Sequence, residues 1–485
     1  MTNNGGRPLT LLAGVRHWFG HFRQDLAVAR ARAYIKQGDK HSEAARNSKA
    51  TEADRLFALA GLKYAAAVAA MPDLSEGLCN WGDALVDHGR TKSGQEAARL
   101  FAMAGERYAA AQRIKPGEPE ALNNWGIALA EQARFATGAE ADHLLALAGE
   151  KFAAALALNP EMNRVLKNWG LASSDLARTR TGEQADALFA LASEKFAAAL
   201  AIERDDDALF GWGNALADQA STKTGVEAER LYVLAGEKYA EALAINPCAA
   251  QVLNNLGSTL SARAGVAPGE DSDRLFLLAG ERFAAALAIE PGYGKALCNW
   301  GWALGNQART KTAEEADRLF GLAGEKFALA SATNPDDNDA VRGWGWTLFR
   351  HGECTTGAEA DRLFALACEK LAAVLEKEPN DHWTLENLGC VLLCRARTMA
   401  GAEAGRLLAT AEDRFLRANS LAPGVADYDL ACLSAIRGDE SAARSWLQAS
   451  LKHETLPPKT KVMDDPDLEG VRDRKWFHAL FEPLP

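Results

Sequence analysis

The sequence predicts an all-α fold in which helical hairpins stack side by side into a solenoid. A triplet, Asn-Trp-Gly or a close variant, returns every 43 or 44 residues, and two further landmarks keep the same register. The composition of 48% hydrophobic and 25% charged residues is that of a folded protein, and its richness in alanine favours helices. These observations predict a helical repeat protein.

Three landmarks define the repeat. The first is the glycine of the triplet, which we call the signature glycine. The second is the leucine of an Arg-Leu-Phe-like segment, and the third is a proline that ends each unit. Chance does not keep three landmarks in one register, so the chain is a repeat array. The glycines are Gly82, Gly126, Gly170, Gly213, Gly257, Gly301, Gly345 and Gly389; the leucines are Leu56, Leu100, Leu144, Leu188, Leu231, Leu275, Leu319, Leu363 and Leu407; the prolines are Pro72, Pro116, Pro160, Pro247, Pro291, Pro335, Pro379 and Pro423.

Each unit is expected to form two helices, as residues 73–116 illustrate. Apolar residues recur at spacings of three and four on both sides of a polar Ser-Gly-Gln-Glu segment. Gly82 and Ala104 should let the two helices approach closely, while Trp81 and Tyr108 fill the space beside them. One hairpin cannot bury both of its apolar faces, so neighbouring hairpins must stack.

A serine or threonine stands before most second helices, with Glu or Gln three residues later. This spacing is typical of a capping box, in which the hydroxyl accepts a hydrogen bond from a first-turn N–H. We expect this bond at Ser93/Glu96, Thr137/Glu140, Thr181/Gln184, Thr224/Glu227, Thr312/Glu315 and Thr356/Glu359.

Within each unit the order Trp or Leu, Gly, Ala, Tyr or Phe, Ala and Pro resembles the tetratricopeptide repeat. That family's unit has about 34 residues, so the units here are extended by about one and a half turns on each helix. The resemblance covers roughly residues 30–455. It implies a right-handed superhelical solenoid whose first helices line a concave groove. It does not imply one function, because many partners share this fold.

The ends depart from the repeat and suggest four segments. Residues 1–24 are expected to form a basic amphipathic helix that caps the array, or that meets a membrane surface or a partner. Residues 25–72 resemble a degenerate first repeat, and residues 73–423 hold eight extended units. Residues 424–485 resemble a short last repeat followed by a C-terminal capping segment.

Charge and cysteine content limit the classes of function. The net charge is −11, of which residues 1–49 contribute +6 and the remainder −17. An acidic body argues against nucleic acid as a partner, whereas the basic head could dock on a second copy of the chain to form a homo-oligomer. Eight cysteines without a CxxC pair fit a reducing compartment, so we expect a cytoplasmic protein. No apolar run is long enough for a transmembrane helix.

The asparagine before Trp-Gly is the first candidate site. A carboxamide both donates and accepts hydrogen bonds, so a row of them could grip an extended peptide backbone. This resembles the asparagine ladder in the repeat superhelix of O-linked N-acetylglucosamine transferase. The alternative is that each asparagine bonds the backbone of the neighbouring hairpin. The candidates are Asn80, Asn124, Asn168, Asn255, Asn299 and Asn387.

Residues that differ between repeats on the same face form the second candidate site. Trp302, Arg342, Trp346 and Trp383 gather in the C-terminal half, and Trp and Arg are common binding hot spots. The alternative is that the extra tryptophans belong to the core.

A row of acids on the first helices precedes arginines by three residues, at Asp87/Arg90, Glu131/Arg134 and Asp175/Arg178. These residues are expected to form ion pairs within one helix; a stripe for a basic ligand is the alternative.

No phosphate-binding loop, nucleophile elbow, HExxH or dinucleotide-binding motif is present in the sequence. We therefore expect no enzyme activity, no catalytic residue, no metal and no cofactor. The predicted function is a non-catalytic scaffold that binds a peptide or protein segment in the concave groove. The alternatives are a self-assembling structural protein and a regulatory adaptor subunit of a multiprotein complex.

Overall fold

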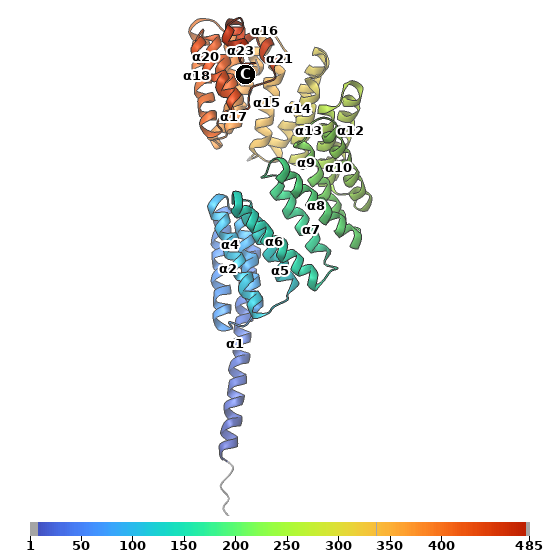
Figure 1. Cartoon of the computed structure of the whole chain (residues 1–485), viewed down its shortest axis with the longest axis vertical. Coiled ribbons are helices and arrows are strands. Elements are labelled where there is room, and N and C mark those ends of the chain that lie inside the picture. The colour runs from blue at the N-terminus through green and yellow to red at the C-terminus, as the bar shows by residue number, and fades with distance from the viewer. Residues whose placement is uncertain (1–7, 336, 482–485) are drawn as a thin grey trace, which may run out of the picture. The chain divides into compact units, whose positions relative to one another are not determined.

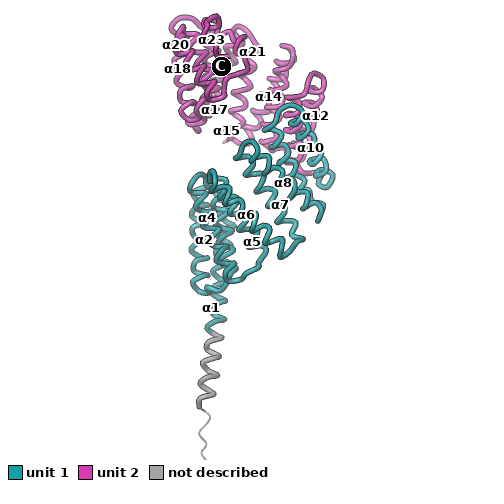
Figure 2. The backbone as a smooth tube through the Cα atoms, viewed as in Figure 1, with its two compact units in different colours: residues 1–246 teal, residues 247–485 magenta. Residues whose placement is uncertain are grey.

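The computed structural model describes the backbone of residues 8–335 and 337–481, and the side chains from residue 23 onward within those ranges. These residues form helices and no strand, so the predicted all-α class is confirmed. Consecutive helices pair as hairpins along the chain (Figure 1). The helices belong to two compact units, residues 1–246 (unit 1) and residues 247–485 (unit 2) (Figure 2).

Unit 1 is a series of hairpins in which each odd-numbered helix pairs with the next. Its first helix is continuous and runs through residue 24, where the sequence suggested a boundary. The helices are α1 (Pro8–Arg46), α2 (Ala50–Ala70), α3 (Ser75–Arg90), α4 (Gly94–Ile114), α5 (Pro119–Ala133), α6 (Gly138–Leu158), α7 (Asn163–Ala177), α8 (Gly182–Ile202), α9 (Asp206–Ser221) and α10 (Gly225–Ile245).

Unit 2 continues the same pattern through four long hairpins and ends in shorter helices. Its elements are α11 (Ala250–Val266), α12 (Gly269–Ile289), α13 (Gly294–Ala308), α14 (Ala313–Thr333), α15 (Asn338–Glu353), α16 (Gly357–Lys377), α17 (His382–Thr398), α18 (Gly401–Leu421), α19 (Asp427–Ile436), α20 (Glu440–Lys452), α21 (Lys459–Asp464), the 3-10 helix η1 (Pro466–Leu468), α22 (Glu469–Arg472) and α23 (Lys475–Ala479).

The amphipathic pattern expected for residues 1–24 depends on side chains that lie almost entirely outside the described residues. From Ala31 onward α1 is the partner of α2, since Ala31 and Ile35 are buried in one cluster with Ala60 and Tyr64. The second part of this helix is therefore the first half of a hairpin.

The signature glycine makes room for an aromatic ring of the second helix. A Cβ built on Gly82 would lie 2.7 Å from Cε1 and Cζ of Tyr108, and one on Gly126 would lie 2.7 Å from Cε1 of Phe152. Both rings are fully buried. The expected close approach of the two helices is confirmed, and it requires a residue without a Cβ.

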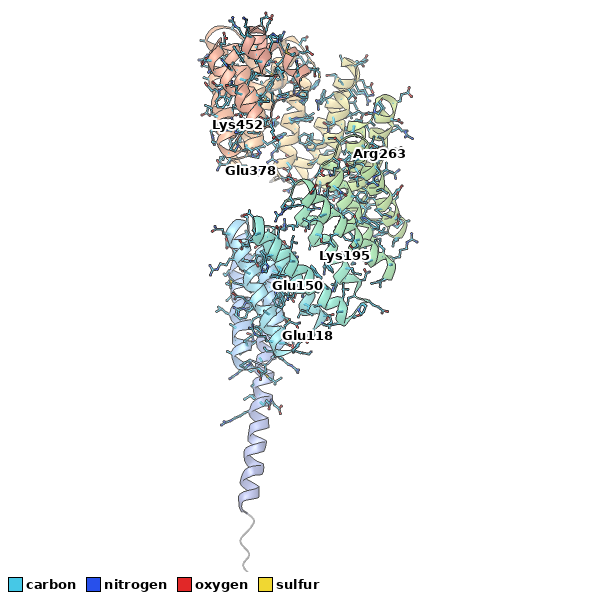
Figure 3. All side chains as sticks on the ribbon, in the orientation of Figure 1. Glu118, Glu150, Lys195, Arg263, Glu378 and Lys452 are labelled. Atoms are coloured by element: carbon cyan, nitrogen blue, oxygen red, sulfur yellow. The ribbon has the colours of Figure 1, made fainter. Side chains whose placement is uncertain are left out.

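The signature tryptophan packs between the second helices of neighbouring hairpins and carries a cation on its face. The Lys195 ammonium lies 4.1 Å from the centre of the Trp169 ring, with both residues in one hairpin. Figure 3 labels Lys195. The same arrangement occurs at Trp81/Arg107, Trp125/Lys151, Trp212/Lys238, Trp300/Lys326 and Trp344/Lys370. Such contacts contribute about 0.5–1 kcal/mol each at exposed sites, so this array adds to the stability of every unit that has it.

The capping boxes were predicted to form a hydrogen bond from a first-turn N–H to the N-cap hydroxyl, and this prediction is wrong. Ser93 and Thr137 occupy the N-cap position, but neither side chain accepts a bond from the helix. The same holds for Thr181, Thr224, Thr312 and Thr356. In five of the six helices the next residue is a glycine with a positive φ, such as 57° at Gly94. This left-handed turn differs from the backbone geometry that brings an N-cap hydroxyl to a first-turn N–H.

Candidate functional site

Three tryptophans of unit 2 meet where the first helices of consecutive hairpins lie side by side. Trp302 on α13 has its ring centre 4.8 Å from that of Trp346 on α15 and 6.2 Å from that of Trp383 on α17. All three are partly exposed. The structure therefore brings together the tryptophans that the sequence placed in separate repeats, and we call them the tryptophan cluster.

Arg342 lies beside this cluster and is held by acids. Its Nε donates to Asp381 at 2.9 Å and its Nη2 donates to Glu378 at 2.7 Å; Figure 3 labels Glu378. Asp339 is a third acidic partner, one turn earlier on α15. The guanidinium is thus neutralised within unit 2, and it positions the segment between α16 and α17 instead of offering a free positive charge.

A hollow of about 720 Å³ lies between Trp302, Arg342 and Trp383. Its wall also includes Glu378, Pro379, Asn380 and Asp381. A hollow with aromatic walls and a polar, acidic rim can accept an apolar side chain of a partner. The tryptophan cluster is therefore a physically reasonable place for an anchor.

The candidate asparagines join neighbouring hairpins through side chains. Asn80 Nδ2 donates to Asp39 at 3.0 Å, and Asn124 Nδ2 donates to Asp83 at 2.8 Å. Each of these aspartates also accepts from a buried tyrosine hydroxyl, Tyr64 or Tyr108. The partner is thus a side chain of the preceding hairpin, whereas the sequence alternative named its backbone.

Two further asparagines bond the preceding hairpin in the same way, but to an amide oxygen instead of an aspartate. Asn168 donates to Asn123 at 3.0 Å, and Asn299 donates to Asn254 at 2.9 Å. Asn254 in turn donates to Asn255, and Asn387 donates to the Trp383 carbonyl of its own helix. A carboxamide has two N–H donors, so gripping a peptide with the second donor stays a prediction for this row.

The acid–arginine row of unit 1 is only partly as expected. Arg134 bonds Glu131 at 3.0 Å and Arg178 bonds Asp175 at 2.6 Å within their own helices. Arg90, however, bonds Glu131 of the next hairpin, at 2.9 Å. The acids are therefore shared between neighbouring hairpins, which one-helix reasoning does not foresee.

Two partly buried acids at the end of the array were missed by sequence reasoning. Burial, followed by repulsion from Asp429, raises the pKa of Glu386 to about 7. Burial likewise raises the pKa of Asp429 to about 6, although a bond to Cys390 opposes the rise. Glu386 stands three residues before the signature glycine, and that variable position was the only signal available.

One group of side chains has the composition of a metal site. Cys432, Asp465 and Asp467 have ligand atoms within 4.8 Å of one another. Their carboxylates already have protein partners, because Tyr428 donates to Asp465 at 2.8 Å and Arg397 bonds Asp467. These contacts account for the cluster as a means of holding the C-terminal segment against α19.

The repeat of Trp, Gly, Ala, aromatic residue and Pro lies on helical hairpins that pack one after another. These features define the class: the chain is a helical repeat protein of the tetratricopeptide type, as predicted. Residues 99–208, within unit 1, match the model of a family described as the plant-specific mitochondrial import receptor subunit TOM20. No significant match to a curated protein was found.

Solved structures with a similar fold share little sequence with this chain. Yeast Tom70 has 14% identity and a TM-score of 0.37, over 93% of this chain and 95% of that one. The C-terminal part of a TPR repeat-containing protein from Cytophaga hutchinsonii has 13% identity and a TM-score of 0.39, over 64% and 98%. YrrB, described as a TPR protein with an unusual peptide-binding site, has 16% identity and a TM-score of 0.30, over 49% and 97%.

The cytoplasmic location expected from the cysteines is contradicted by the family match, because that model describes a mitochondrial import receptor subunit. Free cysteines indicate a reducing environment and do not distinguish between the places that share it. Among the described residues, no helix combines the length and the apolar character needed to cross a bilayer.

Proposed function

We propose that this protein is a non-catalytic scaffold that holds a peptide or protein segment in the groove lined by its first helices. The observation that carries this proposal is the tryptophan cluster: three partly exposed indole rings from three consecutive hairpins lie together, and two of them, Trp302 and Trp383, border one hollow. Aromatic anchors at the centre of an interface commonly supply most of its binding energy. The partial match to a receptor subunit agrees with a role in receiving another polypeptide.

The other hypotheses stay open as outcomes of the test. A regulatory adaptor subunit would use the same groove for a partner within a larger complex. A self-assembling protein would instead use the basic N-terminal segment, and its groove would show no peptide selectivity.

The test begins with selection of 12-residue peptides from a random phage library on the immobilised full chain. Affinities of the selected peptides are then measured by fluorescence anisotropy for the wild type, Trp302→Ala and Trp346→Ala. We expect each substitution to cost about 2 kcal/mol or more of binding free energy, which is the usual loss at a hot spot. The double change Asn255→Ala/Asn299→Ala should cost less, because a net hydrogen bond is worth about 0.5–1.5 kcal/mol.

Trp344→Ala is the matched control. Trp344 is the signature tryptophan of the same helix as Trp346, but it lies under Lys370 of α16 and outside the cluster. Its loss should lower the melting temperature while leaving peptide affinity nearly unchanged. If Trp344→Ala and Trp302→Ala weaken binding equally and in step with stability, the cluster is core and the proposal fails.

A further inference from the structure

The repeat provides an internal standard for two positions, the fifth and the eighth residue after each signature glycine, which we call the rim positions. In unit 1 the fifth is acidic and the eighth is arginine in most hairpins. The arginine bonds the acid of the next hairpin: Arg90 lies 2.9 Å from Glu131, and Arg178 lies 2.7 Å from Asp218. The rim of unit 1 is therefore electrically neutralised by its own residues.

Unit 2 departs from this standard at α13. Arg309 stands at the eighth position, but the fifth position of its own helix is Asn306 and that of the next hairpin is Arg350. Arg350 is itself bonded to Glu353 at 2.6 Å. Within the described part of the chain, the Arg309 side chain makes no hydrogen bond or ion pair, whereas its backbone N–H bonds the Gln307 carbonyl. Arg309 thus has a neighbour of like charge at a position where the hairpins of unit 1 supply an acid.

The first helix of the preceding hairpin, α11, leaves space beside this arginine. At the rim positions α11 has Ala262 and Gly265, so no acid–arginine pair fills the site. A hollow of about 860 Å³ results, lined by these residues together with Asn299, Trp302 and Arg309. Lys311 and Asp273 also reach the hollow, but they are bonded to each other. The hollow therefore combines one unpaired cation, an asparagine amide and one face of the tryptophan cluster.

We propose that this hollow binds a carboxylate side chain of an acidic, extended peptide segment, through Arg309 with Asn306 and Asn299 beside it. This inference rests on the proposed function, because Trp302 lines this hollow and belongs to the tryptophan cluster. A guanidinium that meets a carboxylate forms a charge-assisted and often bidentate bond. Charge complementarity at Arg309 therefore selects an acidic residue next to an apolar anchor.

The charge of unit 2 favours a peptide over a nucleic acid. It contains 26 Lys and Arg against 34 Asp and Glu, a net charge of −8. A polyanion would be repelled by this excess, since nucleic-acid affinity depends on many phosphate contacts. A single carboxylate needs only the local cation.

The test uses fluorescein-labelled 12-residue peptides of glycine and serine with two leucines, in which one Glu moves from position to position. A matched set has Gln in place of Glu. Anisotropy titrations of the full chain should show Glu peptides binding about tenfold more tightly than their Gln partners at the best position. Arg309→Ala should abolish this difference. Because the Arg309 side chain is exposed and unpaired in the described structure, the melting temperature of the Arg309→Ala variant should equal that of the wild type.

Two further variants make the result specific. Asn306→Glu rebuilds the pair that Glu131 and Arg134 form in unit 1, so it should neutralise Arg309 and remove the preference for Glu. Asn306→Gln is its uncharged control and should retain the preference. Arg406→Ala, on α18 and bonded to Glu403 away from the hollow, controls for the loss of one positive charge.

The outcomes separate this inference from the proposed function. If Glu and Gln peptides bind equally, and Trp302→Ala still weakens both, the acid site is overturned and the groove stands. If neither set binds and Trp302→Ala changes nothing, both proposals fail. If a single-stranded RNA oligonucleotide binds through Arg309 more tightly than every Glu peptide, the assignment to an acidic peptide is overturned.

Discussion

Replacing one glycine in the hairpin of α13 and α14 tests how the signature glycine determines the fold. A Cβ at Gly301 would lie 2.8 Å from Cε2 and Cζ of Phe327. The ring cannot move to its other side, because a Cβ at Gly343 of the next hairpin would lie only 2.6 Å from its Cζ. Phe327 is completely buried between these two glycines. Gly301→Ala therefore inserts a methyl group where neither neighbour can give way.

Two opposing contributions set the magnitude of this change. Alanine in a helix interior is more favourable than glycine by about 0.8–1.0 kcal/mol. Inserting a methyl group into a packed core costs about 1–3 kcal/mol, and the upper part of that range applies because the ring is confined on both sides. We expect Gly301→Ala to lower the free energy of unfolding by about 1–2 kcal/mol. For a unit of this size that is a fall of about 2–8 °C in melting temperature.

Gly321 in the same hairpin is the control. It lies inside α14 and a Cβ there would meet no atom within 4 Å. Gly321→Ala should therefore raise the free energy of unfolding, by up to about 1 kcal/mol. Thermal and urea unfolding followed by circular dichroism compare the two variants with the wild type. If both substitutions shift the melting temperature in the same direction, the steric account of the signature glycine is refuted.

Two further predictions concern charge. The pKa of Glu386 is about 7 in the folded chain and near 4.5 in the unfolded chain, so the folded chain favours the protonated carboxyl. The stability that this preference contributes is fully present below pH 4.5 and is lost as the pH rises through 7. Glu386→Gln should therefore raise the free energy of unfolding by about 1–2 kcal/mol at pH 8, and with it the melting temperature, but should change neither at pH 4. An equal shift at both pH values would contradict the assignment. If the basic head, residues 1–49, docks on a second copy, deleting it should abolish oligomers in sedimentation experiments, and raised salt should weaken those of the full chain. A monomer under every condition would remove that idea.

The helices could be predicted from the sequence because the residues that begin and end each helix act locally. The signature glycine, the proline at the end of each unit and the period-four apolar residues act within one hairpin. The error in the capping boxes has the same origin. Ser93 and Glu96 have the right spacing, but the left-handed Gly94 between them redirects the backbone. In five of the six boxes a glycine with a positive φ follows the N-cap residue, and a motif read from side chains alone does not include that φ angle.

The side-chain partners at the candidate site could not be predicted from one unit. Arg342 looked like a free hot-spot residue, whereas Glu378 and Asp381, from the start of the next hairpin, neutralise it. Asn80 and Asn124 likewise bond residues 41 positions earlier. This offset of 41 is the repeat period of 44 minus three residues, so the partners could have been predicted from the stacking of neighbouring hairpins. A prediction that treats each hairpin alone does not find these partners.

Internal repetition separates residues that build the fold from residues available for function. Arg90 and Arg178 show that a rim arginine with its acid forms a neutral link between hairpins. The stack forms equally well at α13, where Arg309 has lost both acids, so folding does not require that pair at every position. A residue type retained without its structural partner is free to meet an external one. For this reason we expect binding in unit 2 to depend more on Arg309 and Trp302 than on the asparagines, several of which already join one hairpin to the next.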